Sequence, residues 1–208
     1  MNESATQLTA LYDKAIELYK RLGIKSVSMD DVARELGISK KTLYQLVANK
    51  EELVAKVMEA DFEKDKAVFE RHQRESRDAI DEFLRNSRYF IREMRQMAPA
   101  AIHDLQKYYP ATWKFMSETH HAEFGRNLVE NIERGMEEGL YRDDLDPTIV
   151  STLYSGMMLM VIDRRVFPAL DRPFSEIILH QTKYHFNGIV NQFGRERLEH
   201  YLSQESLG

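Results

Sequence analysis

The chain has 208 residues, a formal net charge of -5 at pH 7 and no cysteine. The acidic balance argues against a protein that coats nucleic acid through a broad basic surface. Without cysteine there is no disulfide framework, and without a signal peptide or an apolar run long enough to span a bilayer, the expected compartment is the cytoplasm.

An apolar stripe near the N-terminus predicts the first helix. Gly23 follows the stripe, where a residue in the left-handed conformation can end a helix. The stripe consists of Leu8, Leu11, Tyr12, Ala15, Ile16, Tyr19 and Leu22.

Residues 28–47 predict two short helices joined by a tight turn. Ser28 is an N-cap with Asp31 three residues later, and Gly37 ends the first of the two helices. Ser39 caps the second, on which Leu43 faces inward. Two short helices around a glycine turn form a helix-turn-helix, whose second helix reads the major groove of DNA.

The outward face of the second helix carries side chains suited to DNA. Glutamine can pair with adenine, lysine can reach guanine or phosphate, and the threonine methyl group can contact thymine. Between Leu36 and Lys50 there are three lysines and no acid, so the positive charge is concentrated here. An ordinary solvated helix face is the alternative interpretation. The outward residues are Lys40, Lys41, Thr42, Tyr44 and Gln45.

Downstream, capping signals and breaks at proline or glycine predict further helices and no strands. Asn49 with Glu52 predicts a helix from Lys50 to about Glu70. Apolar stripes then occur before Pro99, before Pro110 and up to Gly139. Two long helices follow, over 146–167 with an Asp-Pro start and over 175–193 with Ser175 as cap. The sequence therefore predicts an all-α fold.

The N-terminal motif resembles the DNA-binding domain of TetR-type (TetR/AcrR) transcriptional regulators. The resemblance covers roughly the first sixty residues, and we expect this domain at 1–62 and a helical ligand-binding and dimerisation domain at 63–208. The sequence departs from the family at Ile24 and Val47, where an aromatic residue is frequent, and at Lys41, where a small residue is frequent. The matching segments are 29–33, 36–44 and 49–53.

The resemblance implies a sequence-specific regulator that binds double-stranded DNA. Base edges and nearby phosphates are expected to meet Lys40, Lys41, Thr42 and Gln45. Ser28, Tyr44 and Lys50 are expected to position the DNA backbone. With the cap of the second helix, the expected DNA-binding set is Ser28, Ser39, Lys40, Lys41, Thr42, Tyr44, Gln45 and Lys50.

The resemblance also implies a homodimer that acts as a repressor on a palindromic operator. The expected interface is formed by the last two long helices, 146–167 and 175–193. Gly156 and Gly188 would let backbones approach there, unless they are incidental helix glycines. The dimer would present half-sites about 34–36 Å apart, or as far apart as its geometry sets them.

A small-molecule effector of unknown identity is expected among the central helices, with no cofactor. Bound there, it would move the fourth helix and with it the reading head. Most of the candidate residues could equally be ordinary core. They are Phe90, Met94, Trp113, Met116, Phe124, Tyr154, Met157 and Met160.

An enzyme or a metal-binding bundle is the rival interpretation. Glu118 and His121 form one Glu-x-x-His pair, but a di-iron bundle needs two such pairs, and common catalytic motifs are missing. His103, His120 and His121 could bind a regulatory metal, although surface histidines explain them as well. We therefore predict no catalytic activity and no metal site. A third alternative is a helix-turn-helix interaction protein that does not bind DNA.

Overall fold

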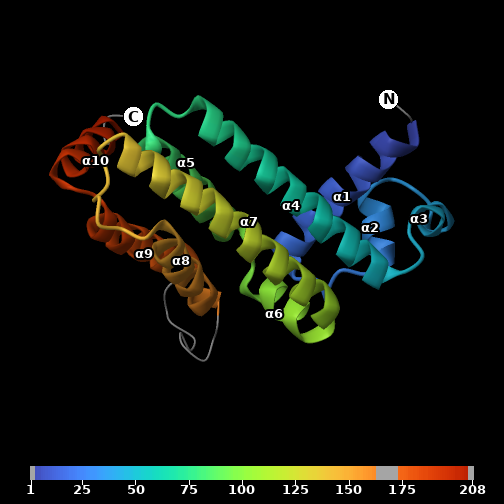
Figure 1. Cartoon of the computed structure of the whole chain (residues 1–208). Helices are drawn as coiled ribbons and strands as arrows, with labels where there is room; N and C mark the ends of the chain where they lie inside the picture. Colours follow the sequence, from blue (N-terminus) through green and yellow to red (C-terminus); the bar gives the residue numbers. More distant parts are fainter. Residues whose placement is uncertain (1–2, 163–172, 206–208) are drawn as a thin grey trace. The chain divides into compact units, whose positions relative to one another are not determined.

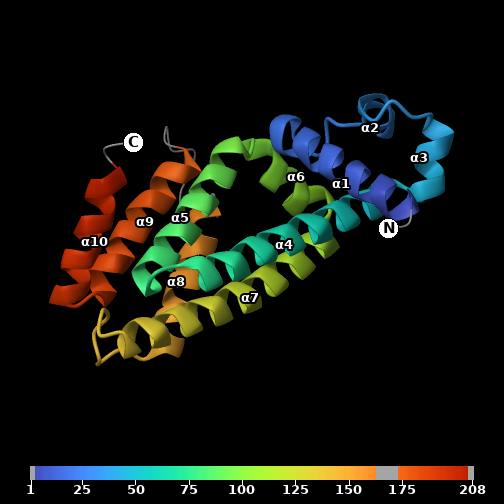
Figure 2. The same cartoon turned by 90° about the horizontal axis from the view of Figure 1, so that it is seen from above.

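A computed structural model describes residues 3–162 and 173–205 of the chain. Regular secondary structure in this part is helical, apart from one isolated antiparallel bridge between Tyr141 and Val190. The predicted all-α fold is confirmed. The helices, seen from two directions in Figures 1 and 2, are α1 (Glu3–Leu22), α2 (Met29–Glu35), α3 (Lys40–Leu46), α4 (Lys50–Glu75), α5 (Ala79–Gln96), α6 (Pro99–Tyr108), α7 (Pro110–Glu137), α8 (Pro147–Ile162), α9 (Phe174–Ile189) and α10 (Gln192–Glu205).

The helices belong to two compact units. The first unit comprises Met1–Ala67 and Gln96–His120, so it holds α1 to α3, most of α4, α6 and the start of α7. The second unit comprises Val68–Arg95 and His121–Gly208, which include the end of α4, nearly all of α5, the rest of α7 and α8 to α10. The domain boundary expected after residue 62 stays a prediction.

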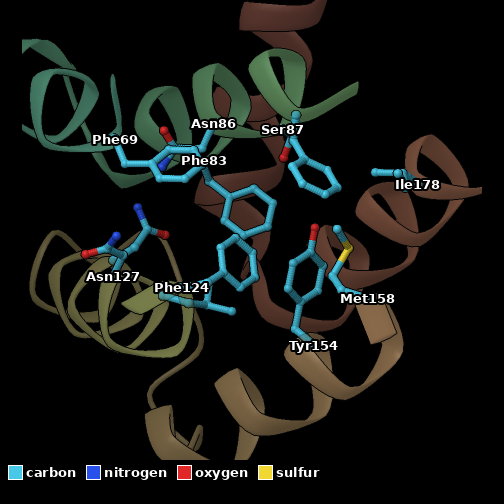
Figure 3. A pocket seen from close by; sticks show the side chains of 12 residues that line it. Phe69, Phe83, Asn86, Ser87, Phe124, Asn127, Tyr154, Met158 and Ile178 are labelled. Carbon is cyan, nitrogen blue, oxygen red and sulfur yellow. The ribbon is translucent and has the colours of Figure 1, made fainter. Parts of the chain in front are cut away.

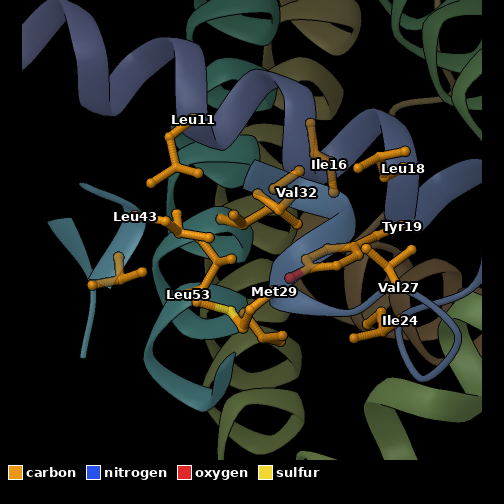
Figure 4. Close-up of a cluster of buried hydrophobic side chains, with 14 of the residues drawn as sticks. Leu11, Ile16, Leu18, Tyr19, Ile24, Val27, Met29, Val32, Leu43 and Leu53 are labelled. Carbon is orange, nitrogen blue, oxygen red and sulfur yellow. The ribbon is translucent and has the colours of Figure 1, made fainter. Parts of the chain in front are cut away.

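The core of the first unit joins the inner faces of its first four helices. Leu11, Leu43 and Leu53 are fully buried there. Figure 4 shows Leu43 of α3 beside Val32 of α2 and Leu53 of α4. Burial of each such side chain contributes about 1.5–3 kcal/mol to stability. The buried side of α3 therefore holds this helix in place, and its opposite side is exposed to solvent.

The predicted turn and cap between residues 28 and 38 are confirmed. Ser28 Oγ accepts from the Asp31 amide (3.1 Å), while the Asp31 carboxylate accepts from the Ser28 amide (2.9 Å). Gly37 adopts φ +67°, and the amides of Gly37 and Ile38 donate to carbonyls in the last turn of α2 at 3.1 and 3.0 Å. This is the Schellman arrangement, and it directs the chain into α3.

Tyr141 organises part of the core of the second unit. Its hydroxyl donates to Oδ1 of Asn131 (3.1 Å), and Nδ2 of Asn131 donates to the Ala79 carbonyl (3.0 Å). The Tyr141 ring lies against Gly135 of α7, where a Cβ atom would overlap the ring. Glycine at 135 is therefore required by the close approach of this buried ring.

The sequence predicts one helix over 175–193. This prediction is wrong at the C-terminal end, where the structure has two helices, α9 and α10. The helix ends at Ile189, because the backbone of Val190 is extended and pairs with Tyr141. The Asn191 side chain donates to the carbonyls of Gly139 (2.9 Å) and Tyr141 (3.1 Å) and accepts from the Gly194 amide (2.9 Å). Asn191 thus caps α10, a helix that the apolar pattern did not reveal.

Other helix ends also differ. Pro173 is the N-cap of α9 in place of the predicted Ser175, and α4 continues to Glu75, beyond the predicted end near Glu70. The predicted start of α8 is confirmed, since Asp146 Oδ1 accepts from the Ile149 amide (2.9 Å). The end predicted for this helix, over 163–167, lies outside the described residues.

None of the described helices combines the length and apolar character needed to cross a bilayer.

Candidate DNA-binding face and effector cavity

The structure brings the expected DNA-binding residues together around α3. Six of the eight lie on α3 or at its N-cap, while Ser28 caps α2 and Lys50 begins α4. Lys41 and Gln45 are exposed, and neither side chain has a hydrogen-bond or ion-pair partner among the described residues. Because they are four residues apart, they lie side by side on the helix surface. Within the described part of the chain they form a free cation next to a free amide.

Two other side chains of this face are held by neighbours. Lys40 Nζ lies 2.7 Å from Asp30 Oδ1, and the two side chains are 58% and 56% exposed. Hydrogen bonding to Asp30 raises the pKa of Lys40. Thr42 donates its amide to Ser39 Oγ (3.0 Å), and the two hydroxyl groups are 2.8 Å apart. Lys40 must therefore leave Asp30 before it can pair fully with a phosphate.

The Lys50 ammonium points toward the protein backbone. It donates to the carbonyls of Ile24 (2.7 Å) and Lys25 (3.3 Å), and partial burial lowers its pKa. These bonds tie the start of α4 to the loop after α1. They give Lys50 a structural role that its sequence position did not reveal, and its contact with DNA stays a prediction.

A small cavity lies inside the second unit. Its volume is about 30 Å³. Figure 3 shows Phe83 and Phe124 near the centre, Asn127 toward the end where Phe69 lies, and Ile178 toward the other end. The lining comprises Phe69, Phe83, Asn86, Ser87, Phe90, Phe124, Asn127, Leu128, Asn131, Tyr154, Met158 and Ile178.

A buried histidine backs the aromatic wall of this cavity. His185 of α9 stacks on Phe83 with ring centroids 5.3 Å apart, and its centroid lies 4.3 Å from that of Tyr154. Burial lowers its pKa to about 4, and its Nε2 atom has no hydrogen-bond partner among the described residues. His185 is therefore a neutral part of the wall at neutral pH.

The sequence profile of the family described as bacterial regulatory proteins, tetR family, matches residues 11–57. This segment contains α2, the glycine turn, α3 and both of their caps. These residues form a TetR-family DNA-binding domain. A domain of this family supports a DNA-binding transcriptional regulator, and the contact of the α3 face with DNA stays a prediction.

Solved structures share the fold over most of the chain. A TetR-family transcriptional regulator from Mesorhizobium loti has a TM-score of 0.67 at 17% identity and covers 92% of this chain and 100% of its own. One from Cytophaga hutchinsonii has a TM-score of 0.68 at 14% identity, with 92% and 98% covered. The fatty acid degradation regulator FadR from Bacillus halodurans has a TM-score of 0.65 at 14% identity, with 89% and 95% covered. No curated protein matches the sequence.

The residues expected at an effector site divide into three groups. Phe90, Phe124 and Tyr154 line the cavity. Trp113 and Met116 belong to the first unit, where Trp113 packs on the core around Leu43. The three other methionines lie elsewhere: Met94 and Met157 pack against buried clusters, and Met160 is 48% exposed.

The polar residues of the cavity lining were not predicted from the sequence. Asn86, Ser87 and Asn127 lie on helices whose apolar stripes were recognised, but a single polar residue beside a stripe carries no signal of its own. Contact of any lining residue with an effector stays a prediction.

The described residues contain no group of three or more histidine, aspartate or glutamate side chains placed to hold a metal ion. His103 and His121 are exposed, and His120 packs edge-on against Phe62 with ring centroids 4.6 Å apart. Burial lowers the pKa of His120. Aromatic packing thus accounts for one of the three histidines that could have bound metal.

Proposed function

We propose that this TetR-family regulator is a ligand-responsive repressor that binds a palindromic operator as a homodimer. The observation that carries the proposal is the outer face of α3, where the exposed side chains of Lys41 and Gln45 have no partner among the described residues and lie beside a fully buried Leu43. The rigid inner face fixes the helix, and the outer face offers groups that reach base edges.

The geometry supports a division of labour on this face. The Gln45 amide, which no described residue engages, matches the N6 and N7 edge of adenine, and Lys41 reaches guanine acceptors or a phosphate. Ser28 and Tyr44 flank these groups and position the DNA backbone. Lys40 joins them once a phosphate replaces Asp30.

An exposed apolar face on α8 supports a dimer. Ile149, Leu153 and Met160 are 59%, 63% and 48% exposed, and with Gly156 they recur at helical spacing along one face. On α9, Tyr184 is 73% exposed, and a Cβ atom at Gly188 would meet no atom of the described residues within 4 Å. Rows of exposed apolar residues mark interaction sites. A second copy would cover them, and Leu153→Glu should then give a monomer in sedimentation experiments.

Regulation would pass through α4. This helix is continuous from Lys50 in the first unit to Glu75 in the second, and its residue Phe69 lines the cavity. A ligand that displaces Phe69 would move α4. The first residue of α4, Lys50, is hydrogen bonded to the loop before the helix-turn-helix, so the movement would reach the DNA-binding helices.

Selection of bound duplexes from a random pool tests DNA recognition and dimerisation together. We expect an inverted repeat whose half-site centres lie about 34–36 Å apart, or at the separation that the dimer sets. A single enriched half-site would contradict the dimer. Absence of salt-sensitive binding to any duplex at low ionic strength would favour the helix-turn-helix interaction protein.

A further inference from the structure

The cavity in the second unit has an uncharged lining. None of the twelve described residues that form it is an acid, a base or a histidine. Tyr154 is the one ionisable member among them, and burial raises its pKa, so it stays neutral at physiological pH. An ion transferred here would lose its hydration without gaining a counter-charge, which is strongly unfavourable.

Part of the polar lining is already satisfied by the protein. Asn131 uses its amide nitrogen on the Ala79 carbonyl (3.0 Å) and its oxygen on the Tyr141 hydroxyl (3.1 Å). The Tyr154 hydroxyl lies 3.4 Å from Thr182 Oγ1 and is also hydrogen bonded to Ser87. These groups hold helices together and have little capacity left for a ligand.

Two amide groups remain available. Oδ1 of Asn86 lies 2.7 Å from Nδ1 of His72 and accepts its hydrogen, because a carbonyl oxygen can only accept. The amide nitrogen of Asn86 has no partner among the described residues. The Asn127 side chain has no hydrogen-bond partner among them. Its side chain lies at the Phe69 end of the cavity in Figure 3. The available donors are therefore N–H groups of neutral amides.

The rest of the wall is aromatic and adaptable. Phe69, Phe83 and Phe124 surround the space near Asn127 (Figure 3), and Met158 closes part of the opposite side. A volume of about 30 Å³ is enough for roughly two water molecules, so a larger ligand must displace side chains. A methionine with three rotatable bonds can do this at low cost, and phenyl rings offer faces and edges for stacking.

We propose that the cavity binds a small uncharged aromatic compound that carries a carbonyl oxygen. The oxygen accepts from the amide N–H of Asn127, with Asn86 as the neighbouring donor, and the ring packs among the phenylalanines. This inference rests on the proposed function in taking the cavity as the effector site, and it adds the chemical class of the ligand.

Three probes of similar size test the class. Acetophenone is neutral and has a carbonyl group, whereas benzoate and benzylamine carry opposite charges on the same ring. In calorimetry or ligand-observed NMR on the full chain, acetophenone should bind and both ions should not. Binding of benzoate or benzylamine as tightly as acetophenone, or no binding of acetophenone, would overturn the proposal.

Variants of Asn127 test the position. Asn127→Leu keeps the size of the side chain but removes the donor, and it should weaken acetophenone binding about tenfold. Asn127→Asp should reverse the preference in favour of benzylamine, a gain that a misfolded variant cannot show. Asn187→Leu makes the same change on an exposed part of α9 and should leave binding unaltered. Unchanged acetophenone binding in Asn127→Leu would refute the assignment.

Measurement of DNA affinity with and without acetophenone separates the two proposals. Release of DNA supports both. Binding of acetophenone at the Asn127 site with no change in DNA affinity would keep the ligand class and refute the effector role.

Discussion

Leu43 and Gln45 are two residues apart on α3, yet their truncation to alanine should have different consequences. Leu43 is completely buried among the helices of the first unit, so Leu43→Ala removes three carbon atoms from a closed core. At about 0.8 kcal/mol for each carbon, the transfer contribution is roughly 2.4 kcal/mol. The cavity left behind raises the expected loss of unfolding free energy to about 3–5 kcal/mol.

Gln45 is exposed and has no partner among the described residues, so Gln45→Ala should change stability by less than about 0.5 kcal/mol. It should alter the preferred DNA sequence, because it removes an amide that can pair with adenine. Leu43→Ala should keep the sequence preference of the folded fraction, since the outward side chains are unchanged.

Thermal unfolding followed by circular dichroism measures the first effect, and duplex selection well below both melting temperatures measures the second. For a chain of this size, a loss of about 3 kcal/mol lowers Tm by roughly 6–12 °C. A Leu43→Ala variant with an unchanged Tm would refute the packing of α3. A Gln45→Ala variant with the parental sequence preference would refute the assignment of base contacts.

Three further predictions concern charge, packing and pH. Asp30→Asn should release the Lys40 ammonium from its ion pair, so binding to mixed-sequence duplex should tighten, and the gain should shrink as salt is raised. Gly135→Ala should lower the unfolding free energy by about 1–3 kcal/mol, because the added Cβ overlaps the buried Tyr141 ring. Acidification from pH 6.5 toward 4 should lower Tm, since His185 binds a proton in the unfolded chain before it does so in the fold; His185→Leu should flatten this part of the profile.

Each of these has a control or a contrary outcome. The Asp30→Asn effect should vanish in a Lys40→Gln background, and an equal effect there would show that Asp30 does not act through Lys40. Gly125 lies on the same helix as Gly135 with only ordinary contact to Ser151, so Gly125→Ala should be neutral or stabilising. A pH profile that is unchanged by His185→Leu would contradict the third prediction.

The helix-turn-helix could be predicted because its signals are local. Ser28 and Asp31 cap each other across three residues, and Gly37 closes α2 through bonds within five residues. The same locality revealed Asn49 as the cap of α4, where its Oδ1 accepts from the Glu52 amide (2.9 Å). Short-range rules decide such features wherever they occur.

The break between α9 and α10 could not be predicted, because Asn191 owes its position to the carbonyls of Gly139 and Tyr141, about fifty residues earlier in the chain. The cavity could not be predicted either, because its lining also comes from distant parts of the chain. Periodicity identified Phe124 and Trp113 alike as inward-facing, but only the packing of helices shows that they belong to different units. Helical stripes report which side is buried, and the neighbour across the interface remains undetermined.

The contact between Gly135 and the Tyr141 ring couples two positions six residues apart. Any substitution at 135 introduces a Cβ atom where the ring lies, and a smaller residue at 141 would remove both the obstacle and the hydroxyl that Asn131 accepts from. Descendants of this sequence should therefore exchange both positions together or neither. In an alignment of homologous sequences, positions 135 and 141 should therefore covary.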